Sequence, residues 1–232
     1  STLLTTAVTF ALAGSAFAEG CDKIVFSDVG WTDITATTAA TSLVLQALGY
    51  ETETQMLAVP VTYEAMASGD VDVFLGNWMP TMESNIAPYL EAKTVDSLRP
   101  NLEGAKYTLA TNAKGAELGI KDFADIATHA ADLDNKVFGI EAGNDGNKLI
   151  LDMIDKDAFG LKAANVELIE SSEQGMLAQV ARADNEGKAV IFLGWEPHPM
   201  NAKFKMSYLT GGDDFFGPNL GGATVLTNTR AG

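Results

Sequence analysis

Hydrophobic positions along the chain follow two different periods in turn. Short runs rich in β-branched and aromatic residues, typical of strands, alternate with segments whose apolar residues recur every three or four positions, typical of helices. From residue 23 the predicted order is strand, helix, strand, helix, strand, over residues 23–29, 35–48, 53–59, 61–68 and 71–75. A second group, which starts with a helix and ends with a strand, is predicted over 123–133, 136–140, 146–156, 166–170, 173–183 and 189–193.

The two groups predict an α/β protein built from two units. The stretch between them, from Asn101 to Gly119, is polar and contains glycine, so it is expected to connect the units. A last strand-like run covers residues 223–228. Alternation of this kind is typical of parallel α/β construction, and two such units predict a cleft between two lobes. Open α/β sheets bind ligands beyond the carboxyl ends of their strands.

The three tryptophans stand at such strand ends. Trp31, Trp78 and Trp195 each follow a glycine by one or two residues, where a predicted strand gives way to a loop. A single tryptophan is more often a core residue than a site residue, but three at the same kind of junction predict rings that converge on the cleft. The faces of such rings attract a quaternary ammonium ion, by about 0.5–2 kcal/mol per ring.

Two polar residues near the predicted cleft each have two open interpretations. Asp33 points into the cavity beside Trp31 if the backbone there is extended, or it caps the helix expected to begin near Thr35. Asn144 lies in a turn before the predicted helix 146–156, where it either contacts a ligand or caps that helix. The residue types fit both roles, so the sequence leaves both alternatives open.

The start of the chain predicts export. Residues 1–18 carry no charge and end in the A-x-A pattern of a signal-peptide cleavage site, with cleavage expected after Ala18 and the mature protein in the periplasm. The alternatives are a hydrophobic first helix or a membrane anchor, for which the stretch is short. It has neither a charged start nor an initiator methionine, so we expect it to be part of a signal peptide. The single cysteine, Cys21, is either a free thiol or paired with a cysteine outside these 232 residues.

Charge and motif content narrow the function further. The 31 acidic and 15 basic side chains give a net charge of −16, which argues against nucleic acid or an anionic membrane as the main partner and is compatible with a cationic ligand. No G-x-S-x-G, H-E-x-x-H, P-loop or G-x-G-x-x-G motif occurs, so the sequence predicts binding without catalysis and no cofactor or metal.

Four longer motifs surround the candidate residues. They are VGWTD at 29–33, FLGNWMP at 74–80, GNDG at 143–146 and GWEPHP at 194–199. Together, and in this order, they resemble the substrate-binding proteins of glycine-betaine and choline ABC transporters, with the best agreement to the choline-binding branch. The resemblance covers almost the whole chain after residue 18.

The resemblance implies a periplasmic binding protein type II fold, with two α/β lobes joined by a hinge that closes around the ligand. Residues 19–106 would form the first part of lobe 1, residues 107–200 lobe 2, and residues 201–232 a return segment towards lobe 1. The family chain normally continues past the equivalent of Gly232 and carries a second cysteine able to pair with Cys21. The implied binding residues are an aromatic box of Trp31, Trp78, Tyr107 and Trp195, with Asp33 and Asn144 at the hydroxyl end of the ligand.

The implied function is capture of choline, and more weakly of acetylcholine, by a monomer that delivers it to an ABC transporter permease in the inner membrane. Glycine betaine or proline betaine is the first alternative, but Asp33 in the pocket would repel their carboxylate. An exported hydrolase of choline esters is less favoured, because only His129 and His198 are available and no nucleophile motif accompanies them. A structural or adhesive module would show no ligand-dependent change in tryptophan fluorescence.

Overall fold

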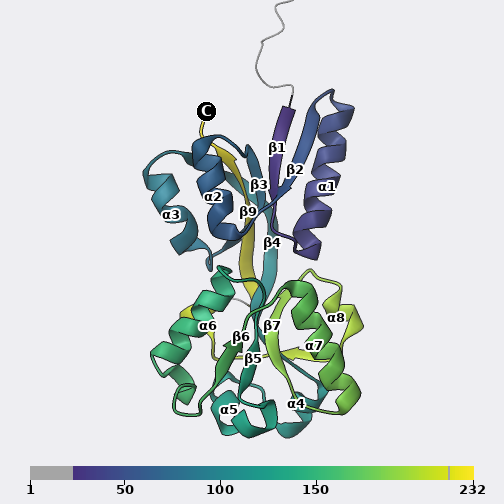
Figure 1. The fold of residues 1–232 in the computed structure, drawn as a ribbon, viewed down its shortest axis with the longest axis vertical. Helices are drawn as coiled ribbons and strands as arrows, with labels where there is room; N and C mark the ends of the chain where they lie inside the picture. Colours follow the sequence, from purple (N-terminus) through teal and green to yellow (C-terminus); the bar gives the residue numbers. More distant parts are fainter. Residues whose placement is uncertain (1–22, 219) are drawn as a thin grey trace, which may run out of the picture.

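One mixed sheet runs through two α/β lobes that lie end to end (Figure 1). The structure is a computed structural model that describes residues 23–218 and 220–232. The strand order is β2-β1-β3-β9-β4-β7-β5-β6, and β8 pairs with β4. The predicted signal peptide, its cleavage after Ala18 and Cys21 lie outside the described residues.

Lobe 1 contains the first predicted unit. Its strands β1, β2 and β3 pair in parallel in the order β2-β1-β3, which confirms the predicted strand-helix alternation. Helix α1 lies on one side of these strands and helices α2 and α3 on the other (Figure 1). Helix α3 was not predicted. The elements are β1 (Lys23–Asp28), α1 (Thr32–Ala47), β2 (Glu51–Met56), α2 (Val59–Ser68), β3 (Val73–Met79) and α3 (Glu83–Glu91).

Lobe 2 contains the second predicted unit, with β5 paired in parallel to both β6 and β7. The elements are α4 (Ala113–Leu118), α5 (Phe123–Thr128), the 3-10 helix η1 (Ala130–Leu133), β5 (Lys136–Phe138), α6 (Asp145–Asp155), the 3-10 helix η2 (Ala158–Gly160), β6 (Glu167–Ile169), α7 (Glu173–Glu186), β7 (Ile191–Glu196), α8 (Met200–Lys203), β8 (Met206–Tyr208) and α9 (Asp213–Phe216). The single helix predicted over 123–133 is wrong. The backbone leaves the helical conformation at His129 (φ −105°, ψ 18°), whose ring bonds locally to the Asp132 carboxylate.

Two long strands, β4 (Val95–Asn112) and β9 (Leu220–Arg230), join the lobes (Figure 1). The first part of β4 pairs antiparallel with β9 as far as Lys106, and from Lys106 onward β4 pairs with β7. The sequence predicted an irregular connection over much of β4. Its first half is mostly exposed and contains Pro100, which cannot donate to the ladder, so the pairing shifts register between Pro100 and Leu102. The predicted division into residues 19–106, 107–200 and 201–232 stays a prediction.

Each lobe packs its own apolar side chains against the sheet. Phe26 and Phe74 are fully buried in lobe 1, and Phe123 and Phe192 in lobe 2. Burial of apolar surface stabilises the folded state by roughly 25 cal/mol per Å². The close packing of these side chains also fixes the positions of the strand ends at the boundary between the lobes. Among the described residues, no helix has the length and apolar character needed to cross a membrane.

Candidate functional site

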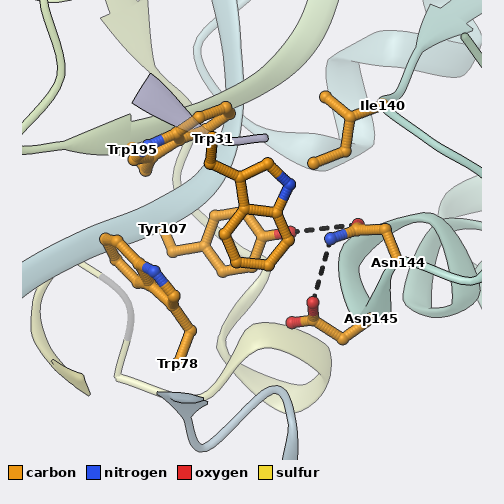
Figure 2. A pocket seen from close by; sticks show the side chains of 7 residues that line it. All are labelled: Trp31, Trp78, Tyr107, Ile140, Asn144, Asp145 and Trp195. Carbon is orange, nitrogen blue, oxygen red and sulfur yellow. Dashed lines mark hydrogen bonds between the residues drawn. The ribbon is translucent and has the colours of Figure 1, made fainter. Parts of the chain in front are cut away.

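An aromatic pocket lies where the two lobes meet (Figure 2). About 220 Å³ of space outside protein atoms lies in it, a volume that includes some open solvent. The pocket is therefore small. It is lined by Trp31, Trp78, Tyr107, Ile140, Asn144, Asp145 and Trp195.

Strands β3, β4 and β7 of the one sheet place three of the four rings. Tyr107 on β4 stands directly opposite Trp195 on β7, so their side chains project to the same face. Their ring centroids are 6.3 Å apart at 88°, and Tyr107 also lies 5.7 Å from the ring of Trp78 on β3. Trp78 and Trp195 are each the last residue but one of their strands, so both stand at strand ends as predicted.

Trp31 reaches the pocket through a turn at Gly30. Gly30 has φ +81°, a conformation that favours glycine, and its N–H donates to Asp28 Oδ1 at 2.8 Å. Helix α1 then begins at Thr32, three residues earlier than predicted, with Trp31 as its N-cap. Asp33 therefore lies in the first helical turn, so the predicted extended backbone there is wrong.

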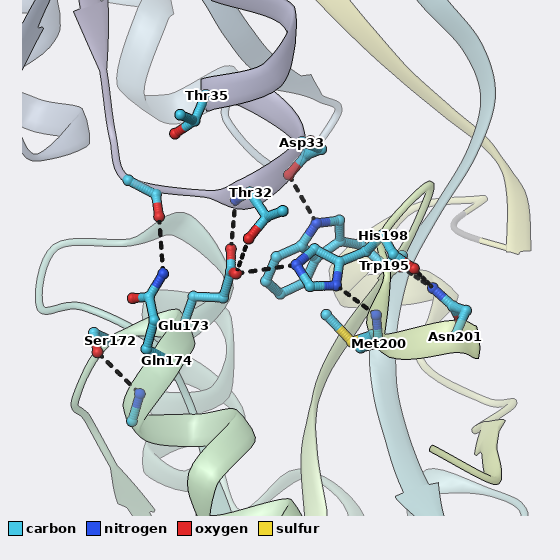
Figure 3. A network of polar contacts seen from close by, with 12 residues as sticks. Thr32, Asp33, Thr35, Ser172, Glu173, Gln174, Trp195, His198, Met200 and Asn201 are labelled. Carbon is cyan, nitrogen blue, oxygen red and sulfur yellow. Dashed lines mark hydrogen bonds and ion pairs between the residues drawn. The ribbon is translucent and has the colours of Figure 1, made fainter. Parts of the chain in front are cut away.

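Asp33 is the one predicted site residue that does not line the pocket. Its side chain is not the helix cap either, because the N-cap residue is Trp31, whose own side chain makes no capping hydrogen bond. Asp33 Oδ1 instead accepts a hydrogen bond from the Trp195 indole at 3.0 Å (Figure 3). The carboxylate thus fixes the orientation of the Trp195 ring through its indole N–H, from outside the pocket.

Asn144 caps α6, one of the two roles that the sequence left open, and it also lies in the pocket wall. Its Oδ1 accepts from the backbone N–H of Asn147 at 2.9 Å, which caps α6, and the side chain also lines the pocket. The Tyr107 hydroxyl donates to the same oxygen at 3.3 Å (Figure 2). Gly146 permits this contact, because a Cβ there would lie 2.2 Å from the Tyr107 hydroxyl oxygen.

Asp145 is a lining residue that sequence reasoning missed, although it lies beside Asn144 in the same GNDG turn. Its Oδ1 accepts from Asn144 Nδ2 at 3.0 Å, and its Oδ2 accepts no hydrogen bond of normal geometry. Burial raises the pKa of Asp145 to about 6, although the nearby Thr81 hydroxyl favours the charged form. Ile140, just beyond β5, was missed as well, because an isoleucine at the end of a strand carries no signal that distinguishes a pocket residue from a core residue.

The walls of the pocket are acidic and contain no base. None of the seven lining residues is Lys, Arg or His. Two more carboxylates stand behind the rings: burial raises the pKa of Asp33 to about 6, and it also raises the pKa of Glu141, which accepts from the Trp31 indole at 2.9 Å. An aromatic pocket with this charge distribution suits a cation and disfavours an anion.

The two indole hydrogen bonds cross the cleft in opposite directions. Trp31 of lobe 1 donates to Glu141 of lobe 2, and Trp195 of lobe 2 donates to Asp33 of lobe 1. Each bond joins a neutral donor to a carboxylate, which makes it stronger than a neutral pair. Each bond therefore couples the orientation of a ring to the position of the opposite lobe.

Comparison with known proteins agrees with this geometry. Residues 22–231 match the model of a protein family described as the substrate binding domain of an ABC-type glycine betaine transport system. A solved ABC-transporter choline binding protein in complex with choline is 67% identical, with a TM-score of 0.89, over 91% of this chain and 73% of that chain. The same kind of protein in an unliganded semi-closed conformation is 67% identical, with a TM-score of 0.83 over the same shares.

A more distant structure shows the fold alone. Lactococcal OpuAC, in its closed-liganded conformation complexed with glycine betaine, is 23% identical with a TM-score of 0.79, over 90% of this chain and 77% of that chain. The predicted α/β fold of the periplasmic binding protein type II class is confirmed.

We expect Asp145→Asn to stabilise the unliganded protein at pH 7.5, and to do so by only about half as much at pH 5. The folded pKa of about 6 exceeds the usual value of about 3.9, so the folded state loses stability as the pH rises from about 4 to 6. The full shift corresponds to about 3 kcal/mol at most. Thermal unfolding at both pH values measures this, with Asp155→Asn at the exposed end of α6 as the control. Equal shifts at the two pH values would contradict the prediction.

Proposed function

The chain belongs to the family of substrate-binding domains of ABC-type glycine betaine transport systems, and from this membership we propose that it captures choline for uptake. The observation that carries the proposal is an aromatic pocket whose lining contains one carboxylate, that of Asp145, and no base. The choline binding protein that is 67% identical supports the choice of ligand.

Four rings bind the trimethylammonium group. Trp31, Trp78, Tyr107 and Trp195 line the pocket and are each at most 5% exposed, so the cation loses nearly all of its contact with water. At about 0.5–2 kcal/mol per ring, four rings supply roughly 2–8 kcal/mol of cation–π attraction. Burial of three methyl groups adds to this, and Asp145 balances the charge.

The polar side of the pocket receives the hydroxyl group. Asn144 and Asp145 lie together there, and Asp145 Oδ2 is free to accept a hydrogen bond from the ligand. Asp33 contributes its negative charge through Trp195, whose N–H it accepts. The six residues predicted from the sequence thus act together, with Asp145 added to them.

Glycine betaine fits this pocket less well. Its carboxylate requires N–H donors or a cationic side chain, and the lining residues offer neither a lysine nor an arginine. Asp145, Glu141 and Asp33 would also repel it. Acetylcholine keeps the cationic group but has lost the hydroxyl donor and is larger, so it binds more weakly.

Transport follows from closure. The open form admits choline, and the closed form, held by the indole bonds across the cleft, docks on a permease that an ATPase drives. Ligand shifts the equilibrium towards the closed form because it contacts both lobes there. The protein works as a monomer in the periplasm, after removal of residues 1–18.

An intrinsic-fluorescence titration tests the ligand choice. We expect choline to bind at least tenfold more tightly than glycine betaine, and at least about thirtyfold more tightly than its uncharged isostere 3,3-dimethylbutan-1-ol, because only choline engages the ring faces as a cation. Trp78→Ala should weaken choline binding, and Tyr50→Ala, outside the pocket, should leave it unchanged. Equal affinities for choline and glycine betaine would refute the assignment, as would parent-like binding by Trp78→Ala.

Choline binding should weaken as the pH falls. Asp145 and Asp33 both have a pKa of about 6, and only their charged forms attract the cation. Each carboxylate that must be ionised reduces affinity by about tenfold for every pH unit below its pKa. Calorimetric titrations between pH 7.5 and 5 measure the profile. Asp145→Asn should bind more weakly at pH 7.5 and show a flatter profile, whereas Asp155→Asn should follow the parent.

Choline esters should bind without being cleaved. His198 is poorly placed to activate water, because Nδ1 accepts from the Met200 N–H at 2.9 Å, and Nε2 is buried 3.0 Å from the Glu173 carboxylate in a side chain that is only 2% exposed. Incubation with acetylcholine followed by an assay for free choline checks this. Steady release of choline above the uncatalysed rate would show that the protein is an enzyme.

A further inference from the structure

A third carboxylate contact crosses the cleft, and this one lies away from the pocket. Glu173 is the first residue of α7 in lobe 2, and it reaches Thr32, the first residue of α1 in lobe 1 (Figure 3). Glu173 Oε2 accepts from the Thr32 backbone N–H at 2.8 Å, and Oε1 accepts from the Thr32 hydroxyl. The carboxylate thereby satisfies a free N–H at the positive end of a 16-residue helix, a favourable place for negative charge.

His198 holds Glu173 in position. The Met200 N–H donates to His198 Nδ1, so the ring proton resides on Nε2, which lies 3.0 Å from Glu173 Oε1. Both side chains are only 2% exposed. Burial by itself would raise the pKa of Glu173, but the hydrogen bonds from His198 and Thr32 outweigh it and lower that pKa below its usual value. Glu173 is therefore ionised and nearly rigid.

The contact is connected to the aromatic pocket at both ends. Thr32 lies between Trp31 and Asp33 in the chain, and the His198 ring packs against Trp195 with centroids 4.8 Å apart at 67°. Asp33 in turn accepts from Trp195. Glu173 can bond Thr32 only when lobe 2 has brought Trp195 to Asp33, so this contact forms with closure and touches none of the pocket space.

We propose that Glu173, held by His198, is an interlobe latch that keeps the closed form shut and so sets how long the ligand is retained. Glu173 is a positioning residue, because it lies outside the pocket and acts through the first turn of α1. The proposal rests on the proposed function, in which closure traps choline.

Stopped-flow binding of choline to the whole chain separates a latch from a binding residue. Glu173→Gln keeps the shape but leaves one acceptor oxygen for three donors, so the dissociation rate should rise by about tenfold or more, while the association rate stays within about twofold of the parent. Glu186→Gln, at the exposed far end of α7 and about 20 Å away, should match the parent in both rates.

Two further measurements keep the test decisive. His198→Gln should raise the dissociation rate in the same direction, and the double variant should be no faster than Glu173→Gln alone, because both changes release one latch. Solution scattering at saturating choline should show a larger radius of gyration for Glu173→Gln than for the parent. If Glu173→Gln does not fold, the dissociation rate of His198→Gln and its radius of gyration at saturating choline, each compared with the parent, decide the matter.

The outcomes separate this proposal from the proposed function. A parent-like dissociation rate in Glu173→Gln overturns the latch, and so does a slower association rate with unchanged dissociation. If the parent itself does not bind choline, the proposed function fails; scattering without ligand then tests the latch, and identical radii for the parent and Glu173→Gln overturn it too.

Discussion

The hydrogen bonds that the indoles of Trp31 and Trp195 donate across the cleft connect every part of this structure. Each bond has its ring in one lobe and its carboxylate in the other, at 2.9 Å to Glu141 and 3.0 Å to Asp33. A ring held in this way can turn only if the lobes move apart. The same bonds place negative charge directly behind the rings, which increases the attraction of their faces for a cation. The same two hydrogen bonds therefore hold the lobes together, orient the tryptophan rings and place negative charge next to them.

The site maintains its charge against the tendency of buried carboxylates to become neutral. Asp33 and Asp145 have pKa values of about 6, so near neutral pH both are ionised but poorly solvated. A bound cation supplies the missing solvation, and part of the binding free energy comes from relieving that unfavourable state. Glu173 differs, because three donors surround it and keep it charged without a ligand. The pocket is thus prepared for a cation, and the neighbouring contact is already satisfied.

The pairing of strand β4 explains why residues from both lobes come together at the pocket. Strand β4 pairs with β9 in lobe 1 and with β7 in lobe 2, so Tyr107 lies just beyond the residue where the pairing changes. Its ring contacts Trp78 and Trp195, one from each lobe, and its hydroxyl reaches the start of α6 at Asn144. Tyr107 therefore lies at the boundary between the lobes and contacts both of them.

Local patterns in the sequence were sufficient for the strand and helix order of both units, for the three tryptophans and for the motifs that indicate the family, because periodicity and motif spacing depend on neighbouring residues. They were not sufficient for β4, which is a strand only because β9 and β7 pair with it. Nor did they predict the start of α1 at Thr32, which removed Asp33 from the pocket wall. Three contacts join residues that are far apart in the chain: Trp31 and Glu141 by 110 positions, Thr32 and Glu173 by 141, and Asp33 and Trp195 by 162. Such pairs leave no periodic trace, so only the packing of one lobe against the other determines them.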